Sequence, residues 1–85
     1  LPEGQFVFVS GEVIRPGQIL FTNGLTASQA VTLAGGPSAL AWLSRAFIIR
    51  NGEQISVNLK RIRDGKSSEI MMQPGDELYI KKSAF

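Results

Sequence analysis

Residues 25–37 read LTASQAVTLAGGP and carry a complete signal for one helix, with a start, a buried face and a stop. Thr26 and Gln29 have the types and the spacing of a capping box, in which each side chain accepts a hydrogen bond from the other residue's backbone N–H. The apolar side of the helix spans an arc of about 100° and consists of Ala27, Ala30, Val31 and Ala34. Gly35 suits the left-handed residue that ends a helix, and Pro37 prevents the helix from resuming. A helix this short is marginal alone in water, so a packing partner must stabilise it.

Two strand signals precede this helix. Residues 6–9, FVFV, are apolar at every position, which is typical of a central strand covered on both faces. We expect this strand to continue as far as Arg15. Pro16-Gly17 is typical of the centre of a type II turn. Residues 18–22 then form the second strand of a hairpin.

The segment after the helix predicts a second hairpin. Residues 38–44 are expected to be irregular or a short helical turn, and residues 45–50, RAFIIR, a third strand. Asn51-Gly52 is the strongest short hairpin signal in the chain. Residues 54–58 alternate between polar and apolar side chains, as a half-buried strand does.

The remaining elements complete a two-layer fold. Residues 59–65, LKRIRDG, predict one or two helical turns ended by glycine, and residues 73–76, QPGD, predict a second proline–glycine turn whose N–H groups bond Asp76. Residues 77–81 form the last strand. This order predicts an α+β domain, a mixed sheet of about five strands with one main helix packed on one face. A β-grasp arrangement fits it, with the first and last strands parallel at the centre of the sheet.

Length and composition limit the class of protein. The 85 residues, 44% of them hydrophobic, indicate a single globular domain with a core from about residue 5 to residue 81. The chain has no cysteine and no histidine, which removes thiolate chemistry and the commonest general base and metal ligand. A net charge of +2 is too weak to indicate nucleic-acid binding. No apolar run approaches the roughly 18 residues of a membrane span. We expect a domain cut from a longer protein, with any signal peptide, lipid anchor or membrane association outside residues 1–85.

Four residues are the candidate ligand or subunit contacts. Arg15, Arg45 and Arg50 lie near predicted strand ends, where solvated charge is the ordinary interpretation. The alternative is contact with an acidic polymer or a neighbouring subunit, because guanidinium matches carboxylate and phosphate geometry. Trp42 is expected to be a lid on the core, and stacking of its indole on a sugar ring is the alternative.

The same residues resemble a known family pattern. Residues 9–17, VSGEVIRPG, resemble the opening of the soluble-ligand-binding β-grasp, or SLBB, family, and residues 25–36 resemble its helix. Three further landmarks follow in the same order at residues 43–45, 57–59 and 73–80. Within the family the chain is most similar to the domain of bacterial outer-membrane polysaccharide export proteins, which are periplasmic, ring-forming lipoproteins.

The resemblance implies a non-catalytic structural or interaction domain of a periplasmic capsule or exopolysaccharide export complex. Its implied partners are neighbouring subunits and domains of the same protein, with an acidic polysaccharide as a further candidate and no nucleic acid. Apolar side chains on both sides of the predicted strands also hint at assembly. A saccharide or small-ligand binding module and a DNA-uptake-type relative remain alternatives. No catalytic, cofactor or metal residue is predicted, since the adjacent carboxylates of Asp76 and Glu77 point to opposite faces of a strand.

Overall fold

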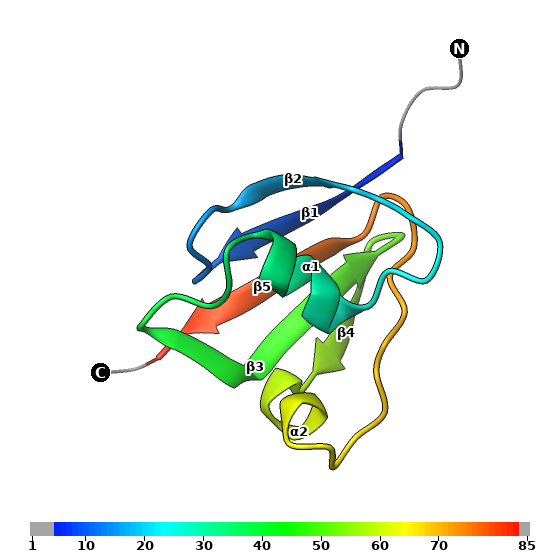
Figure 1. The fold of residues 1–85 in the computed structure, drawn as a ribbon. Helices are drawn as coiled ribbons and strands as arrows, with labels where there is room; N and C mark the ends of the chain where they lie inside the picture. The colour runs from blue at the N-terminus through cyan, green and yellow to red at the C-terminus, as the bar shows by residue number, and fades with distance from the viewer. Residues whose placement is uncertain (1–4, 84–85) are drawn as a thin grey trace.

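The computed structural model describes residues 5–83, which contain five strands and two helices (Figure 1). In chain order the elements are β1 (Phe6–Gly11), β2 (Gly17–Leu20), α1 (Ala27–Leu33), β3 (Ala41–Arg50), β4 (Glu53–Val57), α2 (Leu59–Arg63) and β5 (Glu77–Lys82).

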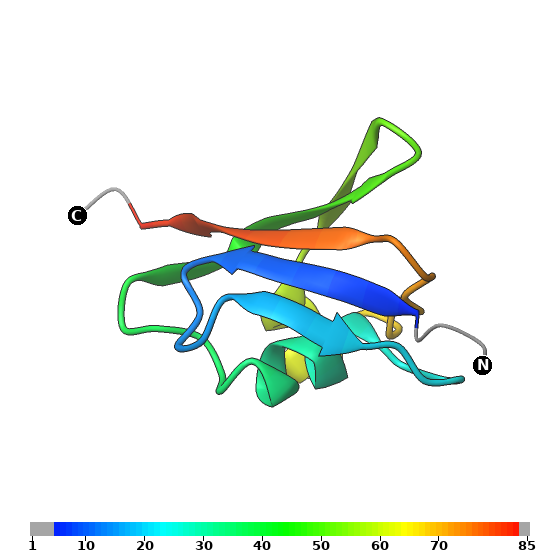
Figure 2. The same cartoon turned by 90° about the horizontal axis from the view of Figure 1, so that it is seen from above.

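The strands form one mixed sheet in the order β2-β1-β5-β3-β4. The first and last strands, β1 and β5, pair in parallel near its centre, and every other neighbouring pair is antiparallel. Both helices lie on the same side of the sheet (Figure 2). The predicted two-layer α+β fold is therefore confirmed, and so is the parallel pairing of its end strands.

Helix α1 starts and stops as its sequence predicts. The Thr26 hydroxyl accepts a hydrogen bond from the Gln29 N–H at 3.2 Å, and the Gln29 side-chain oxygen accepts one from the Thr26 N–H at 3.2 Å. Gly35 follows the helix with φ +91°. All four residues of the predicted apolar stripe are buried. The helix therefore rests on the sheet through small side chains, which allows close approach.

A larger side chain in this stripe should destabilise the fold. Ala30 is fully buried on the sheet-facing side of α1. We therefore expect Ala30→Leu to overpack the contact between α1 and the sheet and to lower the free energy of unfolding by about 1–3 kcal/mol. Thr32→Leu, on the exposed side of the same helix, is the control and should change it by less than about 0.5 kcal/mol. Urea unfolding followed by circular dichroism measures both variants, and equal effects would show that the stripe does not face the sheet.

The core lies between the sheet and the helices. Its largest fully buried apolar side chains come from the three middle strands and are Val7, Val9, Ile48, Leu78 and Ile80. Helix α2 adds Leu59 and Ile62. The Asn58 side chain caps α2 by accepting the Arg61 N–H at 3.0 Å, and Gly65 follows with φ +76° as predicted.

The loop after β1 differs from its prediction. The strand ends at Gly11 rather than Arg15, because the next residues dock on the end of α1: the Ile14 N–H donates to the Gly36 carbonyl at 3.0 Å and the Arg15 N–H to the Ala34 carbonyl at 2.8 Å. The predicted type II turn at Pro16-Gly17 is wrong. Gly17 has φ +149°, far from the roughly +80° of that turn, and already belongs to β2.

Two further strand predictions are wrong. Residues 41–44, expected to be irregular, belong to β3, because Ala41 pairs with Lys82 of β5. The coverage of residues 6–9 on both faces also fails, since Phe8 is 44% exposed. The two later turns are as predicted: Asn51 and Gly52 join β3 to β4 with φ +52° and +80°, and Gly75 has φ +88°.

Candidate functional site

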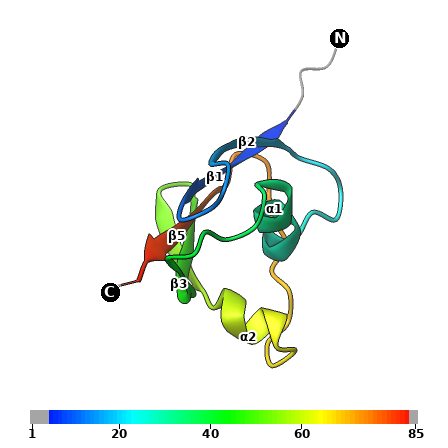
Figure 3. The same ribbon diagram turned by 60° about the vertical axis from the view of Figure 1, so that its left-hand side comes forward.

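One face of the sheet is left uncovered by both helices. Strand alternation places Val7, Val9, Leu78 and Ile80 toward the helices, so their neighbours point the other way. We call this second side the open face; strand pairing places on it Phe8, Ser10, Phe47, Ile49, Glu77 and Tyr79. Figure 3 shows the two helices together on the opposite side.

The open face is apolar and aromatic with one acid near its middle. Phe47 and Tyr79 are paired across β3 and β5, with ring centroids 5.2 Å apart. Phe8 is 44% exposed and Ile49 36%. Glu77 is the strand partner of both, and its carboxylate accepts a hydrogen bond from the Ser10 hydroxyl at 3.2 Å. This arrangement leaves a cluster of large apolar side chains in contact with solvent.

A polar hollow of about 380 Å³ lies on the same side of the sheet, over β3, β4 and the end of β5. Its lining consists of Ser44, Arg45, Ala46, Phe47, Gln54, Ser56, Val57, Asn58 and Lys81. Two cations, side-chain amides and hydroxyls therefore surround one depression, which we call the polar hollow.

A bulge in β3 displays two of the predicted contact residues beside this hollow. Between Ala41 and Ala46 β3 advances five residues while β5 advances two, from Lys82 to Ile80. Trp42 lies in the bulge and is 38% exposed. The Arg45 guanidinium carbon lies 5.4 Å from the centre of its ring, within cation–π range. The prediction that Trp42 is a core lid is wrong, because the bulge holds it at the surface.

The predicted contact residues fall at two ends of the sheet. Arg15 follows the carboxyl end of β1, and Trp42 and Arg45 lie at the start of β3, which runs antiparallel to β5. These three therefore share one end of the sheet, where the β1–β2 loop and the start of β3 lie (Figure 1). Arg50 lies at the opposite end of β3.

Arg50 binds a buried carboxylate. Its Nη2 lies 2.7 Å from Asp76 Oδ2 and its Nε 3.0 Å from Oδ1, while Nη2 also donates to the Met71 carbonyl at 3.2 Å. The Asp76 side chain is 2% exposed and that of Arg50 23%. Hydrogen bonding to Asp76 raises the pKa of Arg50, with burial opposing and charge attraction adding to the rise. As predicted, Asp76 also accepts a turn N–H, that of Gln73 at 2.8 Å.

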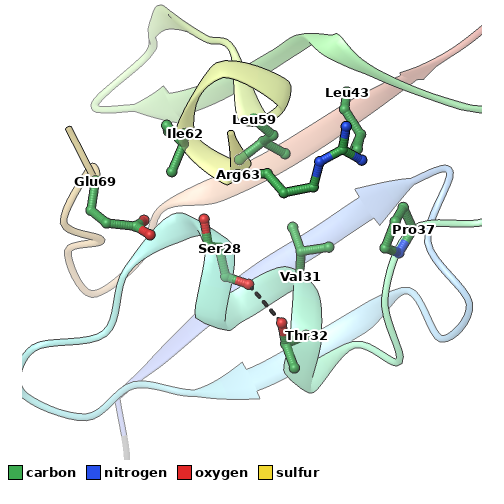
Figure 4. Close-up of a pocket in the computed structure, with 9 residues that line it drawn as sticks. All are labelled: Ser28, Val31, Thr32, Pro37, Leu43, Leu59, Ile62, Arg63 and Glu69. Carbon is green, nitrogen blue, oxygen red and sulfur yellow. Dashed lines mark hydrogen bonds between the residues drawn. The ribbon is translucent and has the colours of Figure 1, made fainter. Parts of the chain in front are cut away.

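A second hollow lies on the helix side, between α1 and α2 (Figure 4). It holds about 300 Å³ and is lined by Ser28, Val31, Thr32, Pro37, Leu43, Leu59, Ile62, Arg63 and Glu69. The Thr32 hydroxyl is used within α1, where it donates to the Ser28 carbonyl at 3.0 Å. Arg63 pairs with Asp64 at 3.3 Å. This groove is mainly aliphatic and differs in chemistry from the polar hollow.

Residues 5–83 contain neither a cluster of metal-ligand side chains nor a helix that could span a membrane. Among residues 5–83, no three acidic side chains gather closely enough to hold a metal ion. Neither helix there has the length and the apolar character needed to cross a membrane.

Sequence reasoning missed most of the polar hollow. Gln54 and Ser56 carry a usable signal, because the alternation of residues 54–58 places them away from the core. Lys81 carries a similar signal in the last strand. These residues lie close to Arg45 because the strands are arranged in the order β5-β3-β4. That strand order cannot be deduced from any local sequence pattern.

Comparison with known families agrees with the family resemblance of the sequence. Residues 5–80 match the family model described as SLBB domain. The match covers all seven helices and strands except the end of β5. The chain is a member of the SLBB domain family.

Proposed function

We propose that this chain is a non-catalytic interaction domain of a polysaccharide export complex in the periplasm. It packs there against neighbouring copies or domains of an outer-membrane-associated protein and helps to form a ring or passage. The observation that carries the proposal is the open face, an apolar sheet surface on which Phe8 and Ile49 are exposed and Phe47 and Tyr79 are half-buried. Membership of the SLBB family supports it, because SLBB domains often occur in polysaccharide export proteins.

The open face has the composition of a protein contact surface. Aromatic side chains are enriched at protein interfaces, and Phe8, Phe47 and Tyr79 lie together on this face. The helices have already buried the other side of the sheet, so the exposed apolar area is left over after the domain has formed its own core. Such area is stabilised when a second surface removes it from water.

The titratable groups favour a structural role over catalysis. Asp76 is the one buried charged residue in the described part of the chain, and Arg50 and a turn N–H occupy its oxygens. Glu77 lies on the open face with a serine hydroxyl as its partner. Neither carboxylate is hydrogen-bonded to a second carboxyl group, the arrangement that a pair of catalytic acids uses.

Charging the open face should disrupt assembly and leave the fold intact. Phe8→Lys and Ile49→Lys together place two cations beside Glu77 on exposed positions. The matched control is Leu33→Lys, an exposed apolar residue of α1. Sedimentation velocity of the intact protein in detergent should show an oligomer for the parent and the control, and a loss of at least tenfold in association constant for the double variant. A monomeric parent, or a double variant that assembles like the control, would contradict the proposal.

A second candidate function is direct saccharide binding. The polar hollow favours it, because amides, hydroxyls and cations meet there beside an exposed indole. This function is compatible with assembly, since a domain lining a passage for a polymer would contact both the polymer and the neighbouring subunits.

A further inference from the structure

We propose that the polar hollow binds an acidic sugar residue, a hexuronate unit of a polysaccharide, with Trp42 beside it. The inference rests on the proposed export function and names the class of polymer that the domain contacts. Its lining and the open-face residues have only Phe47 in common, and neither Phe8 nor Ile49, the positions that test assembly, lines the hollow.

The charge of the hollow selects an anion. Arg45 and Lys81 line it from the neighbouring strands β3 and β5, and neither forms a salt bridge with any residue between 5 and 83. A guanidinium matches a carboxylate in two parallel hydrogen bonds, and an ammonium adds a point charge. No acidic side chain lines the hollow. Arg45 is also held by its contact with the Trp42 ring, which limits its freedom before a ligand binds.

The uncharged groups select a ligand that carries hydroxyls. On β4, Gln54 and Ser56 alternate with residues whose side chains face the core. The side chains of Gln54 and Ser56 therefore line the hollow. Across residues 5–83 neither side chain has a hydrogen-bond partner, whereas Asn58 is already used to cap α2. An amide offers both donors and an acceptor, and a hydroxyl offers one donor and two lone pairs. These groups complement the hydroxyls of a sugar ring rather than the apolar side chains of a peptide.

Trp42 supplies the apolar surface that a sugar ring also needs. A pyranose has a C–H face that packs on an aromatic ring, while its hydroxyls point outward to polar partners. The Trp42 ring is partly exposed next to Arg45, which in turn lines the hollow. The hollow volume of about 380 Å³ lies at the lower end of the range for small-molecule sites. The helix-side groove has an aliphatic lining and a cation already paired to Asp64, so it does not offer these contacts.

A titration of the ¹⁵N-labelled 85-residue chain tests this site. The probe is a trisaccharide of galacturonic acid, and maltotriose is its uncharged counterpart. We expect saturable amide shifts at residues 44–46, 54–57 and 81 and at the Trp42 indole N–H, with at least tenfold weaker binding of maltotriose. Absence of saturable shifts, equal binding of both sugars, or shifts centred on the helix-side groove would overturn the proposal.

Variants assign the shifts to particular groups. We expect Arg45→Gln to weaken trigalacturonate binding at least tenfold, and Trp42→Ala to weaken it severalfold. Arg63→Gln removes an exposed cation on the other side of the molecule and should leave the affinity unchanged. Equal weakening by Arg45→Gln and Arg63→Gln would mean that only net charge matters, and would overturn the site.

The same variants separate this inference from the assembly proposal. Arg45→Gln should leave the sedimentation of the intact protein unchanged, because it lies outside the apolar cluster. The double variant Phe8→Lys and Ile49→Lys should retain trigalacturonate binding in the isolated chain. If the parent protein assembles but its isolated chain does not bind trigalacturonate, the sugar-binding proposal fails. If the isolated chain binds trigalacturonate but the parent protein does not assemble, the assembly proposal fails.

Discussion

Gly11→Ala should lower the free energy of unfolding by about 4 kcal/mol or more, the largest effect we expect of any single methyl group in this chain. Gly11 ends β1 with φ +84° and pairs with Ile80 of β5. An added Cβ would lie almost on the Ile80 carbonyl oxygen and only 3.0 Å from its backbone nitrogen. That carbonyl already accepts the Glu12 N–H at 3.0 Å. Because backbone atoms of a central strand cannot rotate away, the parallel pair itself must separate.

Gly24→Ala is the matched control for this prediction. Gly24 has almost the same backbone angle, φ +85°, but no atom lies within 4 Å of its added Cβ. It should therefore show only the left-handed backbone cost of about 1–2 kcal/mol. Urea unfolding followed by circular dichroism measures both. Similar losses for the two variants would contradict the assignment of the Gly11 effect to the contact between β1 and β5.

Asp76→Ala is expected to have the second-largest effect, a loss of about 3 kcal/mol in the free energy of unfolding. The substitution leaves Arg50 without its carboxylate and removes the acceptor of the Gln73 N–H. Arg50 is partly exposed, so water can solvate part of its charge once the carboxylate is gone. We therefore place the loss of unfolding free energy at the lower end of the range for a broken buried pair.

Asp64→Ala is the control, because it removes an exposed ion pair, that of Asp64 with Arg63. Surface pairs contribute little, so the loss should stay below about 1 kcal/mol. Equal losses for Asp76→Ala and Asp64→Ala in chemical unfolding would contradict the role of the buried pair.

The pH dependence of the Arg50 contribution has a definite sign. The folded pKa of Arg50 is raised above its ordinary value by the bond to Asp76, so its stabilising contribution is complete below the unfolded pKa and is lost only as the pH rises through the folded pKa. Across the neutral range the contribution of Arg50 should therefore be constant.

Elements that depend on neighbouring residues could be predicted from the sequence. The cap, buried stripe and stop of α1 are all written within residues 25–37, and the turn at Asn51-Gly52 needs only two residues. The parallel pairing of the end strands was also predictable, since the unbroken apolar run at residues 6–9 indicates a central strand. The same run wrongly predicts that both faces of the strand are covered, because its outward-facing phenylalanines lie on the face that the helices do not cover.

Apart from the pairing of the end strands, features that depend on contacts between distant residues could not be predicted. The loop after β1 leaves the strand because its N–H groups find the carbonyls at the end of α1, about 20 residues further along the chain. The bulge that exposes Trp42 is set by the register between β3 and β5. The pair of Arg50 and Asp76 joins residues 26 positions apart, so the sequence alone offered Arg50 as a contact residue without its partner.

Hydroxyl-radical footprinting can show directly whether the open face is a docking surface. Oxidation rates of Phe8 and Tyr79 are compared between the isolated 85-residue chain and the longer export protein that we propose contains it, with Met71, exposed and paired with Thr26 beside α1, as the internal reference. We expect both aromatic residues to be oxidised several-fold more slowly in that longer protein, while the rate for Met71 changes little. Equal rates for Phe8 and Tyr79 in the two samples would contradict it.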